Sequence, residues 1–262
     1  MRSPLHRLLA ALGLAIPVIV GAQDTTRGVR IGLTYDPGTK PGIVVLPVNG
    51  VGGDSVAAIL GRDLDYGDRV AVIGLDPGTA RGVVRAGAPN WALLAQLGAA
   101  AAVQVTVTGG GLHLAVYNVA TKQTALIRDY PAPPMADARR WRAALHELSD
   151  NLEASLTGTR GIARTRVLFE RGGRLWTVDS DGQGETPIGS APTPGSAAWH
   201  PSGRTIVYST YVPSQIVVQD IGGRPRTVAG GSGVYISPVF TPDGSSVVYA
   251  HGVDEGVDLY TA

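Results

Sequence analysis

One ten-residue pattern occurs twice in the second half of the chain, and it constrains the fold more than any other feature. WHPSGRTIVY spans residues 199–208, and FTPDGSSVVY spans residues 240–249. In each copy an aromatic residue precedes a Pro-x-Gly turn, where proline presets φ and glycine accepts a positive φ, and a β-branched run follows. The two copies start 41 residues apart, which is the period of a four-stranded propeller blade. The alternative is two unrelated hairpins with the same turn chemistry.

The repeat predicts that residues 164–262 form part of an all-β propeller, with about two blades present. A propeller closes its ring with roughly four to eight blades, and each blade buries one face against the next. Two blades alone would leave a large apolar face in water. We therefore expect the chain to be the front part of a longer protein; the alternative is that the two units pack on another surface.

The composition excludes several classes of site. The chain of 262 residues has no cysteine, so a disulfide framework, a thiolate nucleophile and a cysteine metal site are excluded. Its net charge of +1 is too small to indicate nucleic acid or an anionic membrane as a partner. Hydrophobic residues make up 44% of the chain, which is enough for a buried core in each of two domains.

Residues 1–22 are predicted to be a signal peptide. Arg2 and Arg7 precede an apolar run that is short for a membrane-spanning helix, and small residues end at Ala22. Cleavage is expected between Ala22 and Gln23, and a retained N-terminal anchor is the alternative. No later stretch is long and apolar enough to span a membrane. The mature protein is therefore expected to be exported, with no integral membrane segment.

Residues 23–163 are predicted to form an α/β domain with a mixed sheet and helices. The continuous apolar run at 43–48 is typical of a strand that is covered on both faces. Asp54 or Ser55 is expected to cap the helix that follows, and Asp137 is expected to cap a helix that ends near Leu156. Further strands are expected at 29–34, 69–73, 99–107, 112–119 and 125–130, a short helix at 91–97 with Gly98 after it, and a loop at 76–89.

No motif in the sequence predicts catalysis, a metal or a cofactor. Ser232 lies among glycines, but Val234 occupies the place of the last glycine of G-x-S-x-G. The five histidines do not cluster. Residues 179–184 resemble half of a calcium loop, but Ser190 stands where the bidentate glutamate is needed, so a hairpin turn is expected. The glycines at 50–53 lack a phosphate-binding lysine. Binding is therefore a better default than catalysis.

Several stretches resemble the TolB family, the exported component of the Tol–Pal system of Gram-negative envelopes. Residues 91–99, WALLAQLGA, resemble the family's helix-to-strand step, and residues 156–167, LTGTRGIARTRV, resemble its domain junction. Residues 29–31 and 42–47 resemble the start of its first domain, and Asp63 lies in a motif of its first helix. WHPSG at residues 199–203 is similar to the blade motif WSPDG, which many propellers share.

The resemblance implies a periplasmic scaffold with a six-bladed propeller and no enzymatic activity. It implies that the propeller binds a Pal-like lipoprotein and that the segment after the signal binds a TolA-like protein. Val29, Arg30 and Ile31 fall in that segment and are the candidate residues, because an exposed strand adds to a partner's sheet edge through main-chain hydrogen bonds. Their alternative role is strand pairing within their own domain. The alternative functions are the front half of a propeller-gated serine peptidase and a propeller that binds a small ligand.

Overall fold

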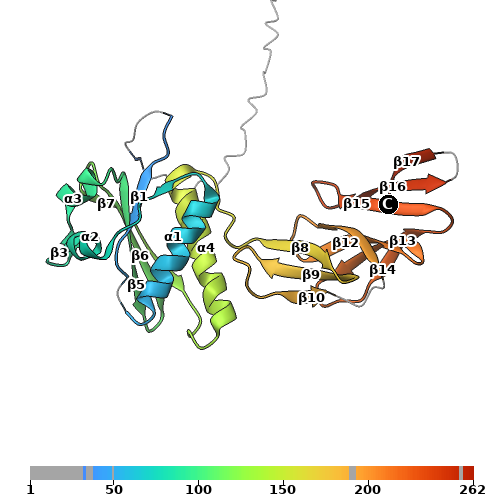
Figure 1. Cartoon of the computed structure of the whole chain (residues 1–262), viewed down its shortest axis with the longest axis horizontal. Helices are drawn as coiled ribbons and strands as arrows, with labels where there is room; N and C mark the ends of the chain where they lie inside the picture. Colours follow the sequence, from blue (N-terminus) through green and yellow to red (C-terminus); the bar gives the residue numbers. More distant parts are fainter. Residues whose placement is uncertain (1–31, 34–37, 49, 189–192, 254–255) are drawn as a thin grey trace, which may run out of the picture.

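The computed structural model describes residues 32–33, 38–48, 50–188, 193–253 and 256–262. Within these ranges the chain forms an α/β domain followed by three antiparallel β-sheets, and the last helix of the α/β domain lies at the junction between them (Figure 1). The strand predicted at 29–34 falls mostly outside the described residues, and Gly32 and Leu33 are not in a strand.

The α/β domain is built on one mixed sheet of five strands. Strand β1 pairs in parallel with β2 and β5, and β5, β6 and β7 are antiparallel neighbours. Ile43 and Val44 are both fully buried, but in different apolar clusters on opposite faces of β1, as the apolar run predicted. The strands, in their order across the sheet, are β2 (Ala71–Val72), β1 (Gly42–Val45), β5 (Ala101–Thr108), β6 (Gly111–Asn118) and β7 (Gln123–Pro131).

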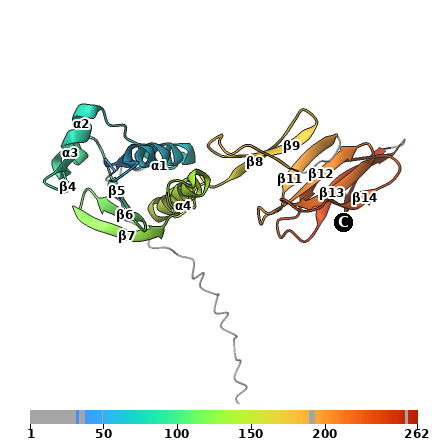
Figure 2. The ribbon, with the colours of Figure 1, turned by 90° about the horizontal axis from the view of Figure 1, so that it is seen from below.

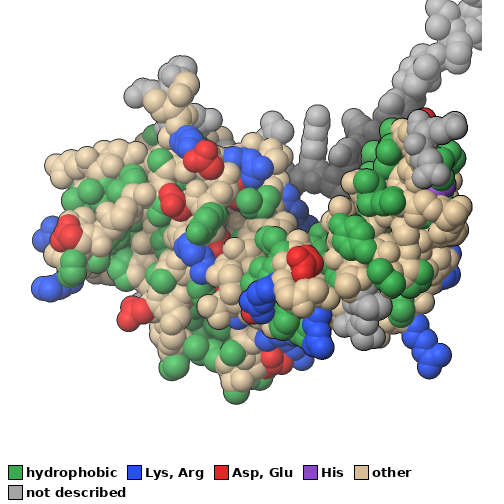
Figure 3. Space-filling view, turned by 45° about the vertical axis from the view of Figure 1, so that its right-hand side comes forward, with side chains coloured by type: hydrophobic (Ala, Val, Ile, Leu, Met, Phe, Trp, Pro, Cys, Tyr) green, Lys and Arg blue, Asp and Glu red, His purple; other side chains and the backbone are tan. Residues whose placement is uncertain are grey.

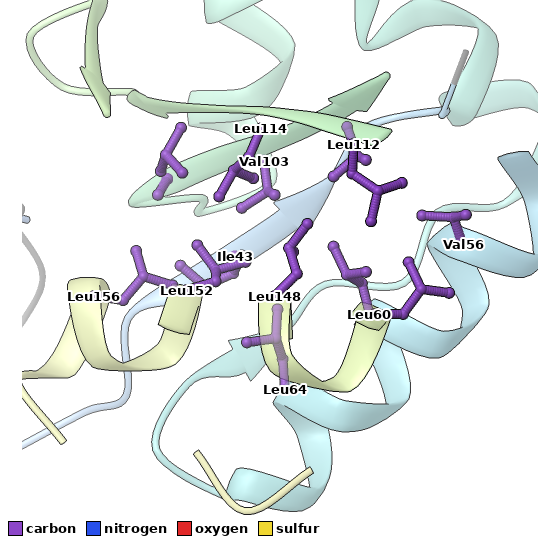
Figure 4. Close-up of a cluster of buried hydrophobic side chains, with 14 of the residues drawn as sticks. Ile43, Val56, Leu60, Leu64, Val103, Leu112, Leu114, Leu148, Leu152 and Leu156 are labelled. Carbon is purple, nitrogen blue, oxygen red and sulfur yellow. The ribbon is translucent and has the colours of Figure 1, made fainter. Parts of the chain in front are cut away.

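Two long helices cover one face of this sheet, and they pack side by side (Figure 2). They are α1 (Gly53–Gly67) and α4 (Ala138–Thr157). Leu60 and Leu64 of α1 and Leu148 of α4 are fully buried against the sheet in the largest apolar cluster (Figure 4). Apolar residues at helical spacing produce this packing, because positions three and four apart lie on one face. The short helix α3 (Trp91–Gln96) carries residues of the smaller cluster on the other face, and Val83, directly after the short helix α2 (Pro77–Gly82), belongs to the same cluster.

The helix ends both confirm and correct the sequence-based expectations. Asp137 caps α4, because its carboxylate accepts the backbone N–H of Arg140 at 3.2 Å. The expected cap of α1 at Asp54 or Ser55 is wrong, since α1 starts after Gly52, which has φ +75° and no side-chain cap. Glycine adopts the left-handed conformation without strain, so Gly52 can precede the first turn of α1 although it has no side-chain oxygen to cap the helix.

The loop expected at residues 76–89 is also wrong. Asp76 caps α2 by accepting the backbone N–H groups of Gly78 and Thr79, and a small hairpin of β3 (Val84–Arg85) and β4 (Ala88–Pro89) follows. These elements are too short to show a hydrophobic period, so only the Asp-Pro pair at 76–77 signalled the helix.

Three antiparallel sheets follow the α/β domain. The first is β8 (Arg166–Arg171), β9 (Arg174–Asp179) and β10 (Thr186–Ile188). The second is β11 (Pro194–Trp199), β12 (Thr205–Tyr211), β13 (Ser214–Asp220) and β14 (Arg226–Gly230). The third is β15 (Val234–Phe240), β16 (Val247–Val253) and β17 (Gly256–Thr261). The sheets stack as propeller blades do but do not close into a ring within the described residues.

Strand β12 lies between two apolar clusters and explains the stacking. Ile206 and Tyr208 pack with Leu175 of the first sheet, whereas Val207 packs with Tyr235 and Tyr249 of the third sheet. Successive side chains of a strand point to opposite faces, so the run at 206–208 buries both faces of the second sheet.

The repeated pattern forms the same turn in both copies. The backbone N–H of His200 donates to the carbonyl of Thr205 at 2.9 Å. The backbone N–H of Thr241 donates to the carbonyl of Ser246 at the same distance. Gly203 and Gly244 have φ of +67° and +73°. The first sheet lacks this pattern, and its β8–β9 hairpin turns through glycines 172 and 173, at φ +61° and +73°.

Candidate interaction site at the junction of the two domains

The segment between α4 and β8 is anchored by a buried carboxylate. Asp150 of α4 is 3% exposed, and its oxygens accept the backbone N–H of Ala163 at 2.7 Å and that of Arg164 at 3.2 Å. Burial raises the pKa of Asp150, and these two hydrogen bonds oppose part of the rise. A Cβ at Gly161 would meet Asp150 Oδ1 at 2.6 Å, so this position requires glycine. The linker therefore leaves α4 along a fixed path.

A buried histidine joins the α/β domain to the first β-sheet. His146 of α4 is 3% exposed. Its Nδ1 lies 2.7 Å from Asp63 Oδ2 of α1, and its Nε2 lies 3.2 Å from Asp181 Oδ2 in the turn after β9. A ring with a carboxylate at each nitrogen is best satisfied as a cation that donates twice. Burial lowers the pKa of His146, but the two carboxylates outweigh that effect and raise it above the ordinary value.

Two arginines complete this buried ionic network. Arg142 of α4 contacts Asp181 at 2.7 Å and Asp179 at 2.6 Å, and Arg62 of α1 lies 3.1 Å from Asp63 and 3.8 Å from Asp181. Burial tends to raise the pKa of Asp181. The hydrogen bond from the backbone N–H of Gln183 and the cations Arg142 and His146 outweigh burial, so the pKa of Asp181 is below its ordinary range. We call Arg62, Asp63, Arg142, His146, Asp179 and Asp181 the junction network.

The junction network is not arranged for nucleophilic catalysis. Ser149, His146 and Asp63 are the residue types of a serine hydrolase triad, but Ser149 Oγ donates to Asp63 at 2.9 Å and to the carbonyl of Leu145 at 3.1 Å. Both ring nitrogens of His146 face carboxylates, so neither is free to accept a serine proton. Ser149 is also 2% exposed and out of reach of a substrate. The arrangement holds two domains together.

An open cleft lies beside the junction network. Its volume is about 890 Å³, and its walls come from α4, the start of β8 and the repeated turns of the second and third sheets. Basic side chains line the region between the two lobes in Figure 3. Its lining includes Arg139, Arg164, Arg166, Asp179, Trp199, Arg204 and Phe240.

The structure leaves the predicted site residues untested. The cleavage site at Ala22 and Gln23 and the candidate partner-binding residues Val29, Arg30 and Ile31 lie outside the described residues. The calcium-like segment is a hairpin turn, closed by the N–H of Gly182 on the carbonyl of Asp179 at 2.8 Å.

Sequence reasoning missed the junction network. Asp63, His146 and Asp181 are separated by 83 and 35 positions, and only the tertiary fold brings them together. Asp63 and Asp181 each stood in a noted motif, but no pattern linked them to His146.

Two general findings concern the described part of the chain. No three or more of its His, Asp or Glu side chains are placed so that they could hold a metal ion. None of its helices has the length and the apolar character that crossing a membrane requires.

Known proteins resemble the chain in sequence and in fold. The Tol-Pal system protein TolB of Sodalis glossinidius is 38% identical over 104 residues, which are 35% of this chain and 24% of that protein. The TolB of Mannheimia succiniciproducens is 28% identical over 246 residues, or 86% of this chain and 56% of that protein. The crystal structure of TolB from Acinetobacter baumannii matches 89% of this chain and 60% of its own chain, with a TM-score of 0.69 and 22% identity.

The chain resembles TolB proteins in sequence and in fold. No protein-family model matches it. The matches span between about a quarter and just over half of the length of these curated relatives. The structural match covers 89% of the chain, and it confirms the predicted fold class of an α/β region followed by propeller-like antiparallel sheets.

Proposed function

We propose that this TolB-like chain is a non-enzymatic interaction protein of a Tol–Pal system, located in the periplasm. In this role it links inner-membrane Tol proteins to a Pal-like lipoprotein and so supports outer-membrane integrity and cell division. The observation that carries the proposal is the alignment with a Tol-Pal system protein over 86% of the chain. The contacts of Ser149 and of the junction network support it, because the serine, the histidine and the carboxylates are used for packing.

The proposed division of the chain follows from the same resemblance. Cleavage between Ala22 and Gln23 releases a mature protein with an α/β domain at 23–163 and propeller blades at 164–262. The N-terminal sequence of the mature protein, read by mass spectrometry from a periplasmic extract, tests the cleavage site. A chain that retains residues 1–22 contradicts the proposal of a soluble exported protein.

Binding to a Pal-like lipoprotein is tested by affinity capture. The tagged full chain is incubated with a detergent extract of the envelope of its own organism, and the captured proteins are identified. A Pal-like lipoprotein is expected in the eluate, and a tagged unrelated periplasmic protein serves as the control. Failure to recover such a lipoprotein above the control contradicts the scaffold role.

Binding of a TolA-like protein is assigned to the segment around Val29, Arg30 and Ile31. Strand addition needs main-chain N–H donors, and proline removes one. Val29→Pro and Ile31→Pro are therefore expected to abolish capture of a TolA-like protein, whereas Asp24→Pro, in the same segment, is expected to preserve it. Equal capture by all three variants contradicts this assignment.

A further inference from the structure

The cleft at the domain junction carries positive charge that no carboxylate of the described residues balances. Asp179 at its wall is already paired with Arg142, and Arg164 is paired with Glu147 at 2.5 Å. Three other guanidinium groups line the cleft, and none has a carboxylate within ion-pair distance in the described part of the chain. They belong to Arg139 of α4, Arg166 of β8 and Arg204 in the turn before β12.

The wall between these cations is aromatic. Arg166 lies over the ring of Trp199 at 4.9 Å and donates to the carbonyl of Gly203 at 3.0 Å, which fixes both side chains. Phe240 of the third sheet lines the same cleft. Trp199 Nε1 is buried, and no described residue accepts its hydrogen bond.

We propose that this cleft binds an extended acidic segment of a partner protein. Carboxylates of the segment pair with Arg139 and Arg204, and an apolar side chain lies against Trp199 and Phe240. Guanidinium groups pair well with carboxylates because their donors match the two carboxylate oxygens. The three free cations come from α4, β8 and a turn of the second sheet, so a chain with several carboxylates suits them better than one small anion.

The size of the cleft agrees with this occupant. Its volume of about 890 Å³ lies in the range of about 300–1,000 Å³ that is usual for ligand sites. The inference rests on the proposed function only in taking a protein segment, and not a metabolite, as the occupant. A synthetic peptide tests it without any Tol or Pal protein, so it fails or succeeds separately from the affinity capture.

The test is fluorescence anisotropy with the full chain and a short fluorescein-labelled peptide of glutamates and leucines. Saturable binding is expected that weakens as salt rises from about 0.05 M to about 0.3 M, because screening shortens the reach of exposed charges. Arg139→Gln combined with Arg204→Gln is expected to weaken binding about tenfold or more. The matched control combines Arg81→Gln and Arg85→Gln, which remove the same charge at α2 and β3. These elements lie at the end of the α/β domain opposite to β8 in Figure 1, so the control should change binding less than about twofold.

Four results would overturn the proposal. They are no binding of the glutamate peptide at low salt, equal binding of the matching glutamine peptide, equal loss in the two double variants, and displacement of the peptide by an equal concentration of inorganic phosphate. The last result would assign the cleft to small anions.

Discussion

Replacement of His146 by glutamine tests whether the junction network is an ionic lock between the domains. The substitution is close in volume, but it removes the buried cation whose two ring nitrogens lie 2.7 Å from Asp63 and 3.2 Å from Asp181. Breaking a buried ion pair by removing one partner costs about 3–5 kcal/mol. Arg142 and Arg62 still face Asp181, and Ser149 still donates to Asp63, so we expect the lower end of this range, about 3 kcal/mol.

The sign of the pH dependence follows from the raised pKa of His146. A group whose pKa is higher in the folded state stabilises that state fully below its unfolded pKa, about 6.5. This stabilisation is lost as the pH rises through the folded pKa. The advantage of the wild type over His146→Gln should therefore be larger at roughly pH 5.5 than at roughly pH 9.

Urea unfolding followed by the helical circular dichroism signal measures this effect, since all helices of the described residues lie in the α/β domain. With a slope of about 1–3 kcal/mol per M urea, the midpoint should fall by about 1–3 M. His113→Gln is the control, because His113 contacts Asp129 at 2.7 Å in an exposed pair, which is worth at most about 1 kcal/mol. Equal midpoint shifts for the two variants, or a wild-type advantage that does not change with pH, would refute the reasoning.

Three further predictions concern the linker, the repeated turn and the third sheet. Asp150→Ala should expose the linker, so that trypsin cuts after Arg160 or Arg164 faster than in the wild type. The control is Asp65→Ala, at an exposed position, which should not change the cleavage rate. Cleavage of Asp150→Ala at the control rate would show that Asp150 does not anchor the linker. Gly244→Ala should lower the free energy of unfolding by about 1 kcal/mol or more beyond the loss in Gly222→Ala. Both glycines have positive φ, but only at Gly244 would a Cβ overlap the His200 ring. Equal losses measured by urea unfolding would argue against this contact. Leu259→Lys should reduce self-association measured by analytical ultracentrifugation, because the apolar side chains of Leu259 and Val257 in the edge strand β17 are 77% and 65% exposed. A wild-type chain that stays monomeric at high concentration would make this prediction wrong.

Local chemistry was enough to predict much of the fold. The cap at Asp137, the glycine after α3 and the turns at Gly203 and Gly244 each depend on a few adjacent residues, so their signals are complete in the sequence. The apolar run at 43–48 predicted a strand with two covered faces for the same reason. Helix α2 was missed because its sequence, PGTARG, has no large apolar residue that could establish a period.

The candidate site depended on the tertiary structure. Asp63, His146 and Asp181 lie in α1, α4 and a turn of the first sheet, and nothing in the sequence pairs them, because an ion pair requires proximity in space and not along the chain. The cleft beside them likewise needs the turns at Trp199 and Phe240 to lie against α4 and β8. The sequence determined which strands, helices and turns form, since these follow from local backbone and side-chain preferences. Only the packing of the two domains decided that a histidine with no recognisable motif became the buried cation between them.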